Sequence, residues 1–211
     1  MGSSPLSISL DWQYLFWMEI QTLCVFCSSS NLVPELFRSD AIALADRLVD
    51  EKITLVYGGG SVGLMGVLAD RILEKGGGVI GVIPEFLRTE ELAHEGLTEM
   101  IVTGSMHERK IEMSRRADAF AVLPGGFGTL DEFFEILTWK QLGLHAKPIV
   151  VANTGGWFDP ILAFFLRAEN HRMVSRENLG LVEVVDSAAL VVDTLLRRRD
   201  PAGAIPRLFR S

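Results

Sequence analysis

The chain has 211 residues, of which 48% are hydrophobic and 22% charged, so it can bury a full core and we expect one folded domain. Its formal net charge of −7 at pH 7 argues against a general nucleic-acid binder, which needs a basic face to neutralise backbone phosphates. No run reaches the roughly 18 apolar residues of a membrane span, so we expect neither a membrane nor a nucleic-acid partner and predict a cytoplasmic location.

The first segment, residues 1–19, fits no unit of the rest of the chain. It lacks the basic start and the clean apolar core of a signal peptide. We interpret it as an extension outside the fold or as a misassigned start with Met18 as the initiator; a helix that touches a membrane or a partner is the alternative. The folded domain is expected over residues 20–200, followed by a C-terminal tail at 201–211.

From Leu23 onward, short apolar runs alternate with segments whose apolar residues recur at helical spacing. The apolar runs predict strands at 22–27, 53–57, 79–83, 100–102, 119–123, 148–152 and 181–185. The periodic segments predict helices at 34–49, 63–75, 105–116, 127–142, 157–168 and 187–197. This alternation is typical of an α/β fold, a doubly wound, Rossmann-like and mostly parallel sheet with helices on both faces, in a single domain.

The two cysteines, Cys24 and Cys27, have the Cys-x-x-Cys spacing that can indicate a redox pair or half of a zinc site. Within a strand, however, residues three apart point to opposite faces and their Cα atoms lie about 10 Å apart. With no second cysteine pair and only four histidines, a zinc ligand set is lacking. We expect two buried, inert thiols and no metal site.

Ligands of a doubly wound sheet bind at the carboxyl ends of its strands, where the winding reverses. The distinctive turns of this chain all follow strands, so the turns at 28–30, 58–63, 85–91 and 125–129 are expected to line one crevice.

The turn Gly58-x-Gly60-x-x-Gly63 matches the dinucleotide fingerprint, and Glu85 lies roughly where the ribose-binding acid is expected. The match is weak, because this turn follows the second strand rather than the first. A mononucleotide phosphate site is the preferred interpretation, and plain turn geometry stays open.

The turn at 124–129 opens a predicted helix, and Glu132 lies about one turn inside that helix. Glycines let a ligand approach the backbone, and a helix N-terminus offers unpaired N–H donors to an anion. A carboxylate beside a bound phosphate indicates chemistry rather than simple anion binding. On the same helix face, Glu135 is either a surface residue or an acceptor for the amine of a heterocycle.

Arg109 and Lys110 lie near the start of another predicted helix at the same sheet edge, two and three residues after His107. Cations at this edge are suited to an anionic ligand, and arginine grips phosphate with two parallel hydrogen bonds. A solvated charged helix face is the alternative.

The segment from Pro124 to Glu132 fits the motif PGGxGTxxE, and together with the triplet 58–60, the segment 106–110 and the segment 137–143 it resembles the LONELY GUY family of cytokinin riboside 5′-monophosphate phosphoribohydrolases. The likeness covers about residues 23–190. It implies hydrolysis of the N-glycosidic bond of a cytokinin or AMP-like nucleoside 5′-monophosphate to free base and ribose 5-phosphate, no cofactor, and a homodimer. Members are often labelled lysine decarboxylases, but nothing in this sequence resembles a pyridoxal phosphate site.

The resemblance also implies roles for single residues. Arg109 and Glu132 become the catalytic pair. The substrate contacts become Gly59, Gly60, Glu91, Lys110, Gly125, Gly126, Gly128, Thr129 and Thr138.

Two departures affect the base pocket more than the chemistry. The family commonly has Pro-Arg-Glu-Leu where this chain has Thr-Glu-Glu-Leu at 89–92, and a tyrosine-rich loop where it has Gly-Trp-Phe at 156–158. A non-catalytic nucleotide-binding or carrier protein and an NAD-dependent oxidoreductase are the alternative functions. The sequence leaves the preferred base open.

Overall fold

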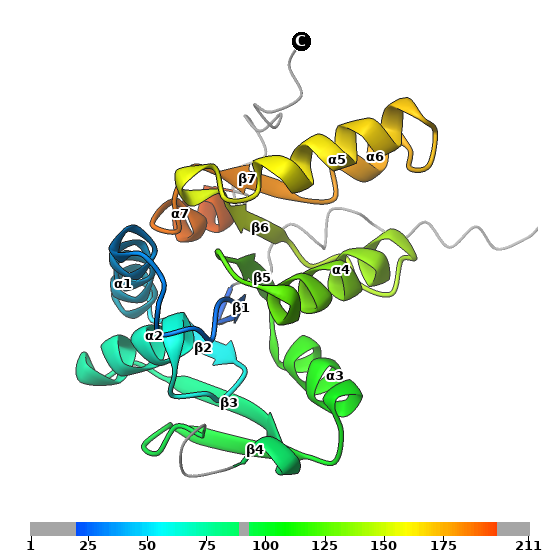
Figure 1. Cartoon of the computed structure of the whole chain (residues 1–211). Coiled ribbons are helices and arrows are strands. Elements are labelled where there is room, and N and C mark those ends of the chain that lie inside the picture. Colours follow the sequence, from blue (N-terminus) through cyan, green and yellow to red (C-terminus); the bar gives the residue numbers. More distant parts are fainter. Residues whose placement is uncertain (1–19, 89–92, 198–211) are drawn as a thin grey trace, which may run out of the picture.

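The computed structural model describes residues 20–88 and 93–197, and Figure 1 shows how they fold. Seven strands form one parallel sheet in the order β4-β3-β2-β1-β5-β6-β7. Helices cover both faces, so the predicted doubly wound α/β fold in a single domain is confirmed. The predicted extension at 1–19, the tail at 201–211 and Glu91 lie outside the described residues.

Every expected strand and helix is present. The strands are β1 (Thr22–Phe26), β2 (Thr54–Tyr57), β3 (Val79–Pro84), β4 (Glu99–Thr103), β5 (Ala119–Val122), β6 (Ile149–Ala152) and β7 (Glu183–Val185). The helices are α1 (Glu35–Asp50), α2 (Gly63–Glu74), α3 (Met106–Arg116), α4 (Phe127–Gln141), α5 (Asp159–Asn170), α6 (Arg176–Leu179) and α7 (Leu190–Arg197), with short 3-10 turns η2 (Glu85–Leu87) and η3 (Thr154–Gly156). Within the described residues, none of these helices has the length and apolar character needed to cross a bilayer.

Each face of the sheet carries its own apolar layer. Along β1 the side chains alternate, so Leu23 and Val25 belong to the core shared with α1, α2 and α7. Cys24 and Phe26 belong to the core shared with α3, α4 and α5. Figure 1 shows these two groups of helices on opposite sides of the sheet. Burial of both faces explains why the central strands are almost continuously apolar.

The two cysteines lie on opposite faces of the sheet, as predicted. Cys24 and Cys27 are free and buried, and they belong to different core clusters. Burial raises the pKa of both thiols, with a further contribution from the negative charge of Glu132. Both thiols are therefore protonated and unreactive at neutral pH.

The winding of the sheet reverses between β1 and β5. From β1 the chain proceeds outward through β2, β3 and β4, and then returns to place β5 on the other side of β1. The Ser28 amide donates a hydrogen bond to the carbonyl oxygen of Pro124 at 3.1 Å, which joins the loops after β1 and β5. The carboxyl edge at this reversal is where open α/β sheets bind ligands.

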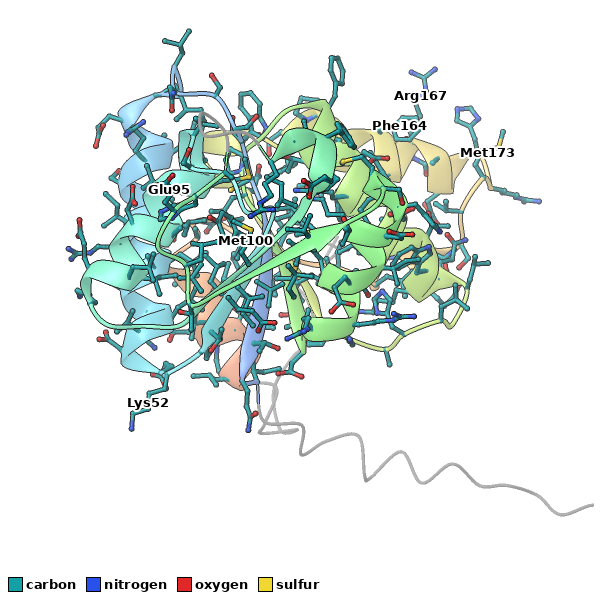
Figure 2. All side chains as sticks on the ribbon, turned by 90° about the horizontal axis from the view of Figure 1, so that it is seen from below. Lys52, Glu95, Met100, Phe164, Arg167 and Met173 are labelled. Atoms are coloured by element: carbon teal, nitrogen blue, oxygen red, sulfur yellow. The ribbon has the colours of Figure 1, made fainter. Side chains whose placement is uncertain are left out.

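The largest difference from the expected elements lies around α5. The helix begins at Asp159 rather than 157, because Gly155 and Gly156 adopt φ values of 61° and 74° in the preceding turn. The four-residue helix α6 was not predicted, since it is too short to show a helical period. The helix α5 and the turn after it also expose apolar side chains: Phe164 is 59% exposed, and Met173 just past the helix is 79% exposed (Figure 2).

Candidate active site

The structure brings Arg109 and Glu132 into direct contact. Arg109 Nη1 donates a hydrogen bond to Glu132 Oε1 at 2.9 Å, and only 10% of each side chain is exposed. The Arg109 Nε group donates to the carbonyl oxygen of Val82 at 3.0 Å, which ties the guanidinium to the end of β3. The predicted catalytic residues therefore form a buried ion pair at the carboxyl edge of the sheet.

The start of α3 explains why Arg109 points inward. The Ser105 hydroxyl accepts a hydrogen bond from the Glu108 amide at 3.1 Å, and the Glu108 carboxylate accepts one from the Gly104 amide at 2.8 Å. Ser105 thus caps the helix, and the two bonds together satisfy backbone amides on either side of the cap, which fixes the first turn of α3. Arg109 comes one turn later, on the same buried face as Met113.

Glu132 lies on the buried face of α4 together with Thr129, Phe133 and Ile136. Burial raises the pKa of the Glu132 carboxyl above its ordinary value, and the positive charge of Arg109 opposes this shift without cancelling it. A carboxylate in such a site has lost most of its water and interacts strongly with any charge that develops beside it.

Lys110 forms further contacts between α3 and α4. Its Nζ atom lies 3.0 Å from Asp131 Oδ2 and 3.0 Å from Glu135 Oε2, and 14% of its side chain is exposed. Burial lowers the pKa of the Lys110 ammonium, but the two carboxylates outweigh this effect and the net shift is upward. The sequence left Glu135 open as a surface residue or as an acceptor for a heterocycle amine. In the structure its carboxylate forms an ion pair with Lys110.

The glycine turn before α4 leaves room for an anion. A Cβ atom added to Gly126 or Gly128 would meet no atom within 4 Å, so both face open space. The helix has no side-chain cap, and its first internal backbone bond runs from the Leu130 amide to the Gly126 carbonyl. The amides before Leu130 have no acceptor within the helix and are available to a ligand.

Gly125 has a packing role in the same turn. A Cβ atom there would lie 2.1 Å from Thr129 Oγ1, so only glycine leaves space for this buried threonine. Thr138 lies six residues beyond Glu132 on α4, about 9 Å along the axis. Its exposed hydroxyl donates to the Phe134 carbonyl at 2.7 Å, so within this chain Thr138 is not brought to the ion pair.

In the turn at 58–63 and the start of α2, backbone amides are already hydrogen-bonded to other parts of the protein. The Gly63 amide donates to Asn31 Oδ1 at 2.8 Å, and the Leu64 amide donates to the Ser28 carbonyl at 2.9 Å. These contacts take up two amides at the start of α2. Asn31 was not among the predicted site residues, although a polar side chain just after the first strand was the available signal.

Gly59 and Gly60 are buried in the same turn and pair with the chain segment that follows residue 92. The Gly59 carbonyl accepts a hydrogen bond from the His94 amide at 2.9 Å, and Gly60 forms an antiparallel bridge with Ala93. Glu85, the expected ribose-binding acid, lies exposed in η2.

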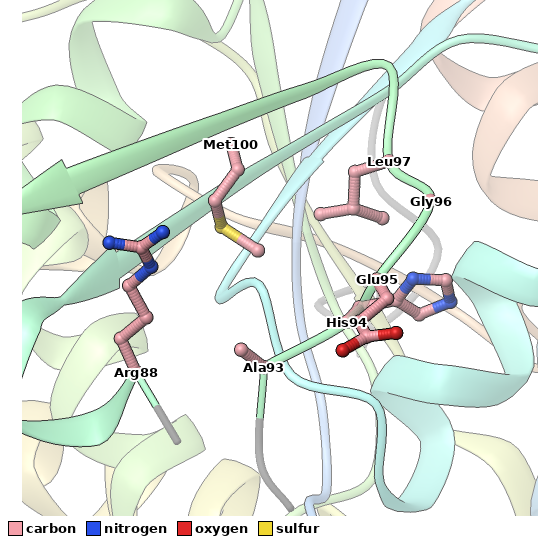
Figure 3. A pocket seen from close by; sticks show the side chains of 7 residues that line it. All are labelled: Arg88, Ala93, His94, Glu95, Gly96, Leu97 and Met100. Carbon is pink, nitrogen blue, oxygen red and sulfur yellow. The ribbon is translucent and has the colours of Figure 1, made fainter. Parts of the chain in front are cut away.

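A separate cavity of about 470 Å³ lies beside this segment, and Figure 3 shows its lining, which includes Arg88, His94, Leu97 and Met100. The Nε2 atom of His94 lies 2.9 Å from the Asp70 carboxylate on α2. None of the predicted site residues within the described part of the chain lines this cavity.

Comparison with known proteins matches the chain to a family model and to sequence relatives. The model of a family described as possible lysine decarboxylase matches residues 65–195. A probable cytokinin riboside 5′-monophosphate phosphoribohydrolase of Oryza sativa subsp. japonica is 51% identical over 146 residues, which are 69% of this chain and 64% of that protein. A cytokinin riboside 5′-monophosphate phosphoribohydrolase of Arabidopsis thaliana is 45% identical over 153 residues, 72% of each chain.

Solved structures with a similar fold are more distant in sequence. The molybdenum cofactor carrier protein of Chlamydomonas reinhardtii superposes with a TM-score of 0.66 at 22% identity, covering 85% of this chain and 98% of that one. The molybdenum cofactor binding protein of Rippkaea orientalis gives a TM-score of 0.65 at 20% identity, covering 85% and 97%. At this identity the likeness shows the fold alone.

Proposed function

Because the chain belongs to the family of cytokinin riboside 5′-monophosphate phosphoribohydrolases, we propose that it hydrolyses the N-glycosidic bond of cytokinin riboside 5′-monophosphates or AMP-like purine nucleotides, releasing free base and ribose 5-phosphate. One observation carries the proposal: the buried Arg109–Glu132 pair lies at the carboxyl edge of the sheet, and Glu132 belongs to α4, the helix whose first turn leaves its amides open.

In this proposal, Glu132 acts on the sugar. Breaking the glycosidic bond builds positive charge on the ribose ring, and a carboxylate beside C1′ stabilises that charge. The same carboxylate orients or deprotonates the attacking water. Burial supports this role, because few waters screen the Glu132 charge.

Arg109 holds the reacting groups in place. A guanidinium group stays charged at neutral pH, so Arg109 acts as a fixed donor to the ribose or phosphate rather than as a general acid. Its bond to Glu132 also keeps the carboxylate in one orientation.

The 5′-phosphate binds at the start of α4 in this proposal. The open space beside Gly126 and Gly128, the uncapped first turn of α4 and the positive end of the helix dipole support that choice, whereas two amides of the turn at 58–63 are already hydrogen-bonded within the protein. Lys110 donates a hydrogen bond to Asp131 and lies in ion-pair contact with Glu135, and its remaining N–H donors are left for the substrate.

The proposal is tested by incubating the purified protein with N6-isopentenyl-AMP, AMP and isopentenyladenosine in parallel and measuring free base and ribose 5-phosphate by chromatography. We expect base release from the monophosphates and not from the riboside, and the ratio of the two rates gives the base preference. Tight AMP binding without release would support a non-catalytic carrier, and stoichiometric NAD binding would support an oxidoreductase.

The quaternary state and location are part of the same proposal. We propose a homodimer that uses α2 and α4, and the apolar side chains that α4 exposes, Phe127 at 93% and Phe134 at 36%, support an interface there. Light scattering during size-exclusion chromatography tests the dimer. We also propose a cytoplasmic location, which the two free thiols suit and a fluorescent fusion tests.

A further inference from the structure

We propose that Gly58 is a positioning residue: its missing side chain creates the seat in which the Arg109 guanidinium lies. The inference rests on the proposed function, because it assigns a role toward the proposed catalytic arginine. A Cβ atom added to Gly58 would lie 2.0 Å from Arg109 Nη2 and 3.2 Å from Arg109 Cζ. Real Cβ contacts are never this short, so alanine at this position and Arg109 in its present place exclude each other.

The guanidinium is held on its other edges by hydrogen bonds. Nε donates to the Val82 carbonyl at 3.0 Å, and Nη1 donates to Glu132 Oε1 at 2.9 Å. Because the guanidinium is planar and rigid, these two bonds also determine where Nη2 lies. Among the described residues, no group accepts a hydrogen bond from Nη2, so its two N–H groups and the second N–H group of Nη1 are left for a substrate.

Backbone geometry does not explain a glycine at position 58. Its neighbour Gly59 has a φ of 74°, which favours glycine, whereas Gly58 is not among the residues with positive φ. An L-residue can therefore adopt the backbone conformation of Gly58. What excludes a side chain is the guanidinium, since the Sδ atom of Met65 would lie 3.3 Å from the added Cβ and would need to move by only a few tenths of an ångström.

This assignment changes the meaning of the first glycine in the fingerprint at 58–63. In a dinucleotide site, glycines of this motif allow the tight turn and the approach of a pyrophosphate. Here the first glycine lets a protein cation approach the backbone instead. The turn after β2 therefore acts on the substrate through Arg109.

The test is a double-mutant cycle between Gly58→Ala and Arg109→Lys, since lysine lacks the Cζ and Nη2 atoms that the new Cβ would meet. We expect Gly58→Ala to lower kcat about 100-fold in the wild-type background, as for a catalytic group displaced by about 1 Å, with a smaller change in KM. In the Arg109→Lys background the same change lowers kcat less than twofold. An equal loss in both backgrounds overturns the proposal.

The matched control is Gly78→Ala, directly before β3 and therefore at the opposite edge of the parallel sheet from Gly58, which follows β2. Its Cβ would also crowd a side chain, Thr54 Oγ1 at 2.9 Å, and Gly78 has no positive φ. We expect Gly78→Ala to keep the wild-type kcat. A loss of kcat there as large as in Gly58→Ala would mean that crowding anywhere in the sheet inactivates the protein, and would overturn the specific role.

A readout without substrate separates this inference from the proposed function. In 15N-labelled protein, the Nε–H resonance of Arg109 is identified by its loss in Arg109→Lys. We expect Gly58→Ala to shift that resonance and Gly78→Ala to leave it unchanged, even if the protein hydrolyses no nucleotide. If the Arg109 Nε–H resonance does not shift in folded Gly58→Ala, the proposal that Gly58 makes room for the guanidinium is wrong.

If Gly58→Ala alone fails to fold, thermal melting of the double variant decides the question. Recovery of the Tm of Arg109→Lys supports the seat, because the lysine removes the clash. Failure of the double variant to fold overturns it.

Discussion

Replacing Glu132 with glutamine tests the central claim of the site, because it removes the charge and keeps the shape and the acceptor for Arg109 Nη1. A unit charge about 4 Å from a developing positive charge is worth about 4 kcal/mol at an effective dielectric constant of 20. That value suits a carboxylate whose side chain is 10% exposed beside Arg109. It corresponds to a loss of about 1,000-fold in kcat.

The assay is the steady-state release of base from AMP or N6-isopentenyl-AMP, followed by chromatography. Glu112→Gln is the control, because it makes the same change in net charge on the outer part of α3, where Glu112 pairs with Arg116. We expect the control to retain wild-type kcat. A loss of less than tenfold in Glu132→Gln would refute the role of the carboxylate in the transition state.

The same substitution leaves Arg109 as a buried charge without its counter-ion. Removing one partner of a buried pair costs about 3 kcal/mol or more of the free energy of unfolding. Urea unfolding measures this loss, and the activity comparison should be made at a temperature where circular dichroism shows both proteins to be folded.

Three further predictions concern pH, phosphate binding and stability. Since burial raises the pKa of Glu132, and the carboxylate is the active form, kcat/KM should fall with decreasing pH from a higher pH than for an exposed glutamate, as a pH–rate profile will show. Ribose 5-phosphate at about 100 times its Kd should add about 2.7 kcal/mol to the free energy of unfolding and raise Tm in a thermal shift assay, whereas ribose should not. Asp40→Ala should lose about 3 kcal/mol in urea unfolding with kcat intact, because Asp40 Oδ2 accepts bonds from the Thr154 hydroxyl and the Ala188 amide; the exposed Asp50→Ala should change little.

The sequence was sufficient to predict the fold because the signals for it are local. Runs such as Ala119–Val122 are apolar throughout and short, and the following segment has a clear helical period, so strand and helix could each be recognised. The helix α5 begins two residues later than predicted, because two glycines with positive φ, Gly155 and Gly156, precede it. A glycine does not reveal from sequence whether it adopts that conformation.

The site was less predictable, because its contacts depend on the order of the strands. The sequence placed Arg109 and Glu132 at the same sheet edge, but their hydrogen bond joins residues 23 apart on different helices. The hydrogen bond from the Gly63 amide to Asn31 joins residues 32 apart in the sequence, and it forms because β1 pairs with β2. Side-chain contacts of this kind follow from the assembled sheet and not from any local pattern.

A carrier and a hydrolase built on this fold should respond differently to the loss of the Glu132 charge. A carboxylate about 8 Å from a bound phosphate repels it by about 2 kcal/mol per unit charge at an effective dielectric constant of 20. A protein that only binds nucleotides would gain affinity from a neutral residue at this position, so nucleotide binding gives no advantage to the charge, whereas a reaction at the sugar does.

We therefore expect Glu132→Gln to bind ribose 5-phosphate up to about 30-fold more tightly than the wild type, measured by isothermal titration calorimetry, while it hydrolyses nucleotides far more slowly. Tighter binding together with slower hydrolysis means that the Glu132 charge destabilises the bound ground state and stabilises the transition state. This preference is the property of a catalytic group. If the variant loses affinity and activity together, Glu132 is a binding residue and the carrier hypothesis gains.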